Sequence, residues 1–166
     1  MEQQAILSVP TVTPLTAEDL PPLADLLAAN GLPTGDLSAP GRRFWRVTDG
    51  DGLLGYGGLE DFGADGLLRS VVVPVERRGG GAGRAVVAAV SAEARRLGVE
   101  RLWLLTIGAA GFFERLGFRR ADRNAAPADI AASAQFAGLC PASAACLRRD
   151  LAPPATATSG RPTGRE

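Results

Sequence analysis

A glycine-rich segment separates two apolar runs in the stretch VVVPVERRGGGAGRAVVAAV, residues 71–90. It reads Arg78, three glycines, Ala82, Gly83 and Arg84. Glycine loses the most backbone entropy on ordering, so this many in one segment indicate a backbone that bends tightly or approaches a ligand closely. Between a strand and a helix, the N–H groups of such a segment and the helix N-terminus form an anion site. The chemistry expected here is therefore phosphate binding.

Three phosphate-binding patterns compete for this segment. A Walker P-loop requires G-x-x-x-x-G-K-[ST], but Gly83 is followed by Arg84, so the lysine is missing. The Rossmann pattern G-x-G-x-x-G fails at its last position, which is Arg84 or Val86 depending on the first glycine. The pattern R-x-x-G-x-G matches in full at Arg78, Gly81 and Gly83. The alternative is a flexible glycine turn without a ligand.

The flanking runs predict the elements that position this segment. Residues 67–75 are mainly apolar, which indicates a buried central strand. Apolar residues at spacings of three and four predict a helix over residues 83–97, ended by Gly98. Elsewhere we expect strands at 5–12, 44–48, 53–61, 99–107, 118–123 and 143–151, and helices before Gly31, within 108–117 and from Pro127.

Length and charge limit the class of protein. The 166 residues suit one domain over 1–151, followed by a tail at 152–166 rich in Pro, Thr, Ala and Gly that we expect to be disordered. Eighteen basic and eighteen acidic residues cancel, which argues against nucleic-acid or membrane binding through a broad basic field. No apolar run is long enough for a membrane span, and the N-terminus lacks a signal-peptide layout, so we expect a cytoplasmic protein.

The chain contains no histidine, which excludes Ser-His and Cys-His nucleophilic catalysis within it, and every histidine-containing metal site. Its two cysteines, Cys140 and Cys146, do not indicate a disulfide framework. Thiolates are soft metalloid ligands, but two thiols without a third form a weak site. We therefore expect buried apolar cysteines and no metal site.

The R-x-x-G-x-G segment resembles the coenzyme A pyrophosphate loop of the GCN5-related N-acetyltransferases (GNAT). A second motif, TIGAAGFFERLGF at residues 106–118, follows after one helix and one strand and resembles the YxxxGF-like signature of that superfamily. The resemblance covers about residues 44–151. It implies an α/β GNAT fold with a mixed central sheet of about six to seven strands, splayed at the central parallel pair and covered by helices on both faces. It also implies acetyl-CoA as cofactor. An exposed sheet edge is compatible with either a monomer or a homodimer.

Four segments, LLRSVVV, LLTIGAAGFFERLGF, APADI and LCPASAACL, together resemble the arsenic-resistance N-acetyltransferase branch. The resemblance implies transfer of acetyl from acetyl-CoA to the amine of a small molecule, such as an amino acid or an arsenic-containing analogue. Two alternatives stay open. One is acetylation of a protein N-terminus or lysine, and the other is a non-catalytic CoA- or metalloid-binding sensor.

The resemblance also implies a cofactor site built from the strand end, the glycine loop and the short helix after it. Pro74 cannot donate to a sheet ladder, so it helps the sheet to open, and the pantetheine arm would then lie along Val73 and Val75 like an added strand. The residues expected to contact the cofactor are Val71, Val72, Val73, Val75, Arg78, Gly79, Gly80, Gly81, Ala82, Gly83, Arg84, Phe112, Phe113 and Arg115.

Acetyl transfer of the kind implied by the resemblance requires a neutral amine, a base, an oxyanion donor and a proton for the leaving thiolate. Glu60, near the end of a hairpin strand, is the expected base, with a solvated strand-end carboxylate as the alternative. The backbone N–H of Val73 is the expected oxyanion donor. Phe113 stands where many relatives carry tyrosine and cannot protonate the thiolate. Either Thr106, Ser70 or water would substitute, or the thiolate would leave unassisted.

Arg69 and Ser70 interrupt an otherwise apolar strand. A charge in a central strand is costly unless it is paired or faces a cleft. Arg69 could hold a carboxylate or other oxyanion of the substrate through its forked donors, or form a salt bridge to an acid such as Glu60 or Asp61. The residues expected to contact the substrate are Glu60, Arg69, Ser70 and Thr106.

Overall fold

The computed structural model describes residues 9–151, so the expected tail at 152–166 and the first half of the strand expected at 5–12 lie outside the described residues. One mixed sheet has seven strands in the order β1-β2-β3-β4-β5-β7-β6, and its only parallel neighbours within the described chain are β4 and β5. The strands are β1 Thr11–Pro14, β2 Arg42–Asp49, β3 Gly52–Phe62, β4 Asp65–Val72, β5 Arg101–Thr106, β6 Arg119–Arg120 and β7 Ala145–Asp150.

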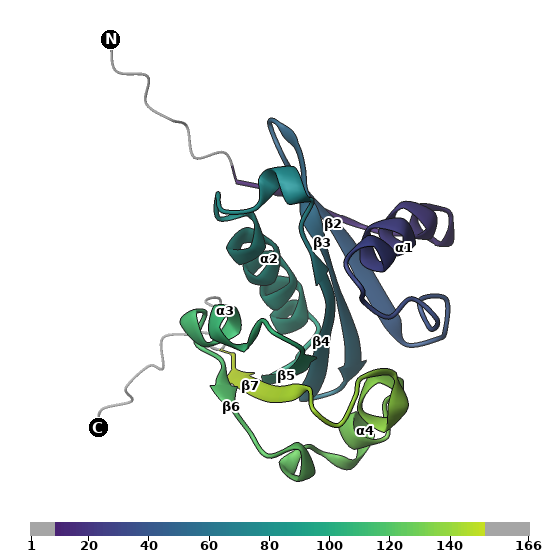
Figure 1. Ribbon diagram of the computed structural model, residues 1–166, viewed down its shortest axis with the longest axis vertical. Coiled ribbons are helices and arrows are strands. Elements are labelled where there is room, and N and C mark those ends of the chain that lie inside the picture. Colours follow the sequence, from purple (N-terminus) through teal and green to yellow (C-terminus); the bar gives the residue numbers. More distant parts are fainter. Residues whose placement is uncertain (1–8, 152–166) are drawn as a thin grey trace, which may run out of the picture.

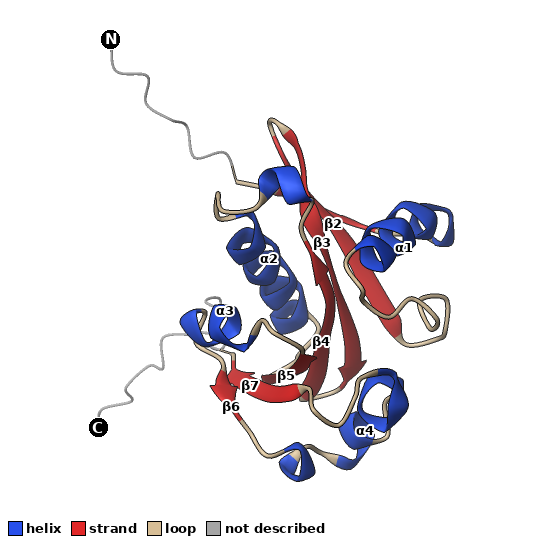
Figure 2. Cartoon of the chain, in the orientation of Figure 1, coloured by secondary structure: helices blue, strands red, loops and turns tan. Residues whose placement is uncertain are grey.

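Helices cover both faces of the sheet (Figure 1). They are α1 Leu20–Ala29, α2 Ala82–Arg96, α3 Ala110–Arg115 and α4 Ala128–Ala131. Buried side chains of α2 and α3 pack on one face, and those of α1 and α4 pack on the other. Figure 2 shows the same arrangement by secondary structure. The predicted fold class is confirmed. No helix among residues 9–151 is long and apolar enough to cross a membrane.

Glycines in β3 let α2 approach the sheet closely. A Cβ added at Gly57 would lie 2.6 Å from the Val90 side chain, and one added at Gly55 would lie 3.0 Å from the Val86 side chain. Real Cβ atoms do not approach so closely, so any larger residue at Gly57 would push α2 away. The N-terminus of α2, which follows the glycine loop, is thereby fixed against the centre of the sheet.

The parallel pair separates along its length. Pairing of β4 with β5 covers Asp65, Gly66 and Leu67, opposite residues 101–103, and no later residue of β4 pairs with β5. On its other side β4 pairs with β3, where Gly58 faces Arg69 and Tyr56 faces Val72. One residue of β3 therefore lies opposite two residues of β4, so β4 carries an extra residue. This β-bulge includes Ser70, whose φ of 56° is the only positive value among non-glycine residues in the described chain. A bulge bends its strand and leaves a residue unpaired, so it widens the opening between β4 and β5.

The boundaries of four predicted elements were wrong. The strand expected at 5–12 is found, among the described residues, only at Thr11–Pro14. The strand expected over 67–75 ends at Val72, because Pro74 lacks an N–H and a 3-10 turn follows at Val75–Arg77. The helix expected from Pro127 is only α4, followed by a π-helical turn at Gln135–Leu139. The side chain of Ser133 donates to the Ile130 carbonyl and competes with the helical backbone. The strand expected at 118–123 is reduced to β6.

Candidate active site

A cleft of about 480 Å³ opens where β4 and β5 separate. Its lining comes from the two strand ends (68–71 and 104–106, continuing to Ile107), the end of α1 and the following loop (30–33), the segment 139–141, and the start of α3 (Ala109 and Phe113). The helices α1 and α3 lie on opposite faces of the sheet. The cleft therefore reaches segments on both faces, as a site joining two ligands would require.

Ser70 lies in the cleft wall in a strained conformation. Left-handed backbone is rare for residues with a side chain and costs of order 1–3 kcal/mol, and such residues gather at functional sites. Its hydroxyl accepts from Nε of Arg69 at 3.2 Å. Thr106, the last residue of β5, lies in the opposite wall of the same cleft. Two of the predicted substrate residues are therefore brought together across the opening.

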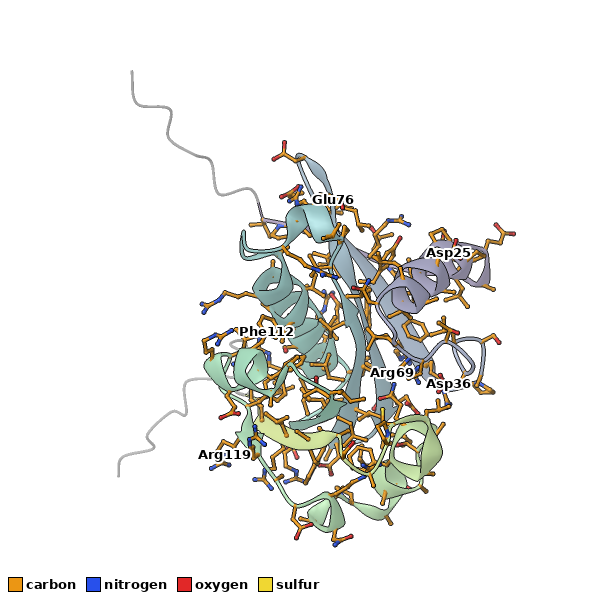
Figure 3. All side chains as sticks on the ribbon, viewed as in Figure 1. Asp25, Asp36, Arg69, Glu76, Phe112 and Arg119 are labelled. Carbon is orange, nitrogen blue, oxygen red and sulfur yellow. The ribbon has the colours of Figure 1, made fainter. Side chains whose placement is uncertain are left out.

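Arg69 lies in a network of four charged side chains, of which Arg69 and Glu60 are buried and Asp36 and Arg42 are partly buried. Its Nη1 and Nη2 donate to the two carboxylate oxygens of Asp36, each at 2.6 Å, and Nη1 also donates to Oε2 of Glu60 at 3.1 Å. Nη2 of Arg42 lies 3.1 Å from Asp36 and 3.6 Å from Glu60. Figure 3 shows Arg69 pointing from the sheet toward the loop that carries Asp36. The two arginines and two acids balance in charge.

These ion pairs set the titration of the network. Burial alone would lower the pKa of Arg69, but the hydrogen bonds and charges of Asp36 and Glu60 raise it overall. The hydrogen bond from Arg69 lowers the pKa of Asp36, although partial burial opposes this shift. Both groups are therefore charged at neutral pH. The sequence had offered an ion pair of Arg69 with an acid such as Glu60, and that pair is present.

Asp36 is the member of the network that the sequence did not suggest. It lies in the loop between α1 and β2, 33 residues from Arg69 along the chain. No periodic pattern surrounds it, and glycine, proline and serine in GLPTGDLSAPG, residues 31–41, predict only a loop. A buried arginine does signal that some acid must pair with it. Which acid does so depends on the path of the loop.

Glu60 is 2% exposed, faces the ion pairs and is not among the residues that line the cleft. Its role as general base stays a prediction. Val71 lines the cleft, whereas Val73 packs beside Val47 and Val86 on the α2 face, so the oxyanion role of the Val73 N–H also stays a prediction.

The glycine loop has open space above it. Gly79 and Gly81 have φ of 85° and 84°, and a Cβ added at either would meet nothing within 4 Å. The loop leads directly into α2, whose first residue, Ala82, is buried. Left-handed glycines followed by a long helix expose N–H groups and the positive end of a helix dipole. This geometry fits a diphosphate, as the R-x-x-G-x-G pattern predicts.

The other predicted cofactor residues surround this loop. Arg78 is exposed and donates to the side chain of Asn30 at the end of α1, and Arg84 is exposed in the first turn of α2. Phe112 of α3 packs over Gly83, where an added Cβ would lie 3.0 Å from its ring (Figure 3). Val75 is 71% exposed and lies in the turn after β4, and its predicted contact with the cofactor stays a prediction.

Phe113 is buried between Phe112 and Phe118 and reaches the cleft. The Phe113 side chain has no proton to exchange. The described residues that line the cleft include no Asp, Glu or His that could act as an acid or base there. Cys140 lines the cleft as a free thiol, and burial raises its pKa, so it is protonated at neutral pH. Among residues 9–151, no three His, Cys, Asp or Glu side chains lie together as a metal site would require.

The fold and the glycine loop define a class of protein that comparison with known families identifies. Residues 40–120 match the family model of the acetyltransferase (GNAT) domain. This segment contains both the glycine loop and the residues 106–118. This segment of the chain is therefore similar to the acetyltransferase (GNAT) domain. No curated protein matches the sequence directly.

Solved structures share the fold at low sequence identity. N-acetylglutamate synthase from Neisseria gonorrhoeae, complexed with coenzyme A and L-arginine, matches 86% of this chain with 20% identity and a TM-score of 0.69. The chain spans only 33% of that enzyme. Rv2747 from Mycobacterium tuberculosis, in complex with CoA and NLQ, matches 86% of this chain and 99% of its own length with 22% identity and a TM-score of 0.69.

A third neighbour is the ribosomal-protein-S18-alanine N-acetyltransferase from Escherichia coli, with 18% identity and a TM-score of 0.64 over 86% of this chain and 94% of the other. These structures establish the GNAT fold for the chain. Their names include enzymes that act on an amino acid and on a protein. At this identity they do not distinguish the arsenic-resistance branch from other branches.

Proposed function

We propose that this chain transfers the acetyl group of acetyl-CoA to the amine of a small molecule held in the cleft between β4 and β5. The opening of the sheet carries the proposal. Pairing of β4 with β5 stops at Leu67, and the cleft that follows is lined from both faces. A direct transfer needs two ligands to meet, and a sheet opened through its centre lets each approach from its own face.

The residues that would hold the cofactor are those of the glycine loop and its neighbours. The N–H groups of residues 79–83 and the N-terminus of α2 would hold the diphosphate, with Arg78 and Arg84 beside it. Phe112, Phe113 and Arg115 would border it from α3. Bound acetyl-CoA supplies an activated acetyl thioester. The chain supplies position and exclusion of water, since most of the cleft lining is apolar.

The proposed acceptor is an amino acid or an arsenic-containing analogue of one. Ser70 and Thr106 provide hydroxyls in the cleft, and Arg69 provides a guanidinium suited to a carboxylate. The name of one fold neighbour, N-acetylglutamate synthase, specifies an acetylated amino acid and supports this class of acceptor.

Two observations favour other functions. The Escherichia coli neighbour is a protein N-acetyltransferase, which favours a peptide acceptor. Phe113 leaves the thiolate without a phenol beside it, which favours a CoA-binding sensor without turnover. The proposed small-molecule activity must therefore be separated from both.

The test is release of free CoA thiol from acetyl-CoA, with mass spectrometry of the product, across amino acids, arsenical amino acids, polyamines and peptides. We expect amine-dependent release with at least one amino acid or arsenical analogue and an acetylated product of the matching mass. Turnover with peptides alone would replace the proposal by the protein acetyltransferase. CoA binding without turnover of any amine would replace it by the sensor.

A further inference from the structure

The carboxylate site on Arg69 is already filled by the protein itself. Both oxygens of Asp36 accept from the two Nη atoms of Arg69 at 2.6 Å, the two-pronged arrangement in which a guanidinium binds a carboxylate. Arg69 lines the cleft, yet its side chain is 0% exposed. An amino-acid acceptor that used these donors would have to replace Asp36.

The charge balance of the network makes simple addition of a second carboxylate costly. Asp36 and Glu60 balance Arg69 and Arg42, and all four lie at least largely buried. An acceptor carboxylate added to this set would leave one buried negative charge unpaired. Exchange of one carboxylate for another keeps the balance and every hydrogen bond of the guanidinium.

The rest of the network would hold Arg69 in place during such an exchange. Nε donates to Ser70 at 3.2 Å, and Nη1 donates to Glu60 at 3.1 Å. Neither partner belongs to the loop that carries Asp36, because Ser70 is in β4 and Glu60 is in β3. These two hydrogen bonds would keep the guanidinium in position if Asp36 left.

The loop that carries Asp36 lacks regular structure, and its one buried side chain, Leu37, packs against α1 and would have to be released if the whole loop moved. It joins α1 to β2 without a helix or strand between them, and Gly31 and Gly41 near its ends have φ of 69° and 83°. Its first residues, Gly31, Leu32 and Pro33, line the cleft, so the same segment forms a cleft wall and supplies the carboxylate. Side chains of this segment and of the facing wall, such as Leu32 and Leu139, make the cleft apolar beside the carboxylate site.

We propose that Asp36 occupies, in the free protein, the place on Arg69 that the acceptor carboxylate takes, and that binding of the acceptor displaces Asp36 together with residues 31–41. The inference rests on the proposed function for the identity of the ligand. Asp36 is then a specificity residue. It reserves Arg69 for ligands whose carboxylate can outcompete it, and the acceptor's apparent affinity is reduced by the fraction of protein in which the loop is docked.

The test compares L-leucine with L-leucinamide, two amines that suit an apolar cleft and differ in the carboxylate. Hydrogen exchange of residues 31–41 in the wild-type protein is measured with each probe, which requires no turnover. We expect L-leucine to accelerate exchange in this segment and L-leucinamide to leave it unchanged. Unchanged or slower exchange with bound L-leucine, or no binding of L-leucine at all, would overturn the proposal.

The variant Asp36→Asn keeps the size of the side chain and removes its charge, and Asp129→Asn, at an exposed acid of α4, is the matched control. With Asp36→Asn we expect the dissociation constant for L-leucine to fall about tenfold, because the competing carboxylate is gone, and that for L-leucinamide to stay unchanged. Weaker binding of both probes would show that Asp36 is a fixed wall. Acetyl transfer is measured in a separate assay. Failure of the loop to move on binding L-leucine is thereby distinguished from failure of the protein to transfer acetyl groups.

Discussion

At the scale of single residues, the most informative side chain is Arg69. The sequence shows an arginine within an apolar strand, and it predicted two possible roles for this arginine. One of these roles, an ion pair with an acid such as Glu60, is present in the structure. Its main partner, Asp36, could not, because the pair joins a strand to a loop of no regular pattern. Residue chemistry thus predicts that a buried charge needs a partner, and the path of the chain decides which one.

Replacement of Glu60 separates two roles for that carboxylate. Glu60 contacts Arg69 and does not line the cleft, so a role confined to this ion pair predicts that Glu60→Gln raises KM for the acceptor and leaves the shape of the pH–rate profile unchanged. The measurement is kcat and KM from about pH 6 to pH 9, the range in which a general base of tuned pKa would titrate. A kcat that falls at low pH and recovers at high pH would instead make Glu60 the base. Asp61→Asn, next to it on β3, is the control.

At the scale of elements, β4 determines the site. The apolar run predicted a central strand over residues 67–75, but not that this strand ends at Val72 or that it bulges. A bulge depends on the register with β3, and register is set by long-range packing, including the close approach of α2 to Gly57. The glycine loop was recognisable because its function demands particular residue types at fixed spacing.

The bulge gives a stability prediction at Ser70. A β-branched residue is poorly tolerated at the φ of 56° found there, so we expect Ser70→Val to lower the free energy of unfolding by about 1–3 kcal/mol. Ser70→Gly relieves the strain and should leave stability within about 1 kcal/mol of wild type, despite the lost hydroxyl. Urea unfolding of the two variants provides the comparison. Equal stability of Ser70→Val and wild type would show that the backbone at this position is not left-handed.

At the scale of the whole molecule, one sheet with helices on both faces brings three distant segments to one opening. The glycine loop follows β4, Phe113 follows β5, and the loop carrying Asp36 precedes β2. The first two could be placed from the sequence, because each directly follows a predicted strand. The third depends on the folding of α1 onto the opposite face, where Leu23 and Leu27 pack on Phe44 and Tyr56. The central claim is that acetyl-CoA binds at this opening with its diphosphate on the glycine loop.

The most direct test of that claim is calorimetric titration of acetyl-CoA into the wild-type protein, Gly80→Val and Gly50→Val. Gly80 lies in the loop without a left-handed φ, and an added Cβ would only come within 3.8 Å of the Arg77 carbonyl, so the variant should fold. Gly50, in the β2–β3 turn, is equally open and is the control. We expect wild type and Gly50→Val to bind alike and Gly80→Val to bind at least about tenfold more weakly, a loss of about 1.4 kcal/mol. Equal binding by all three proteins, or none by wild type, would contradict the account.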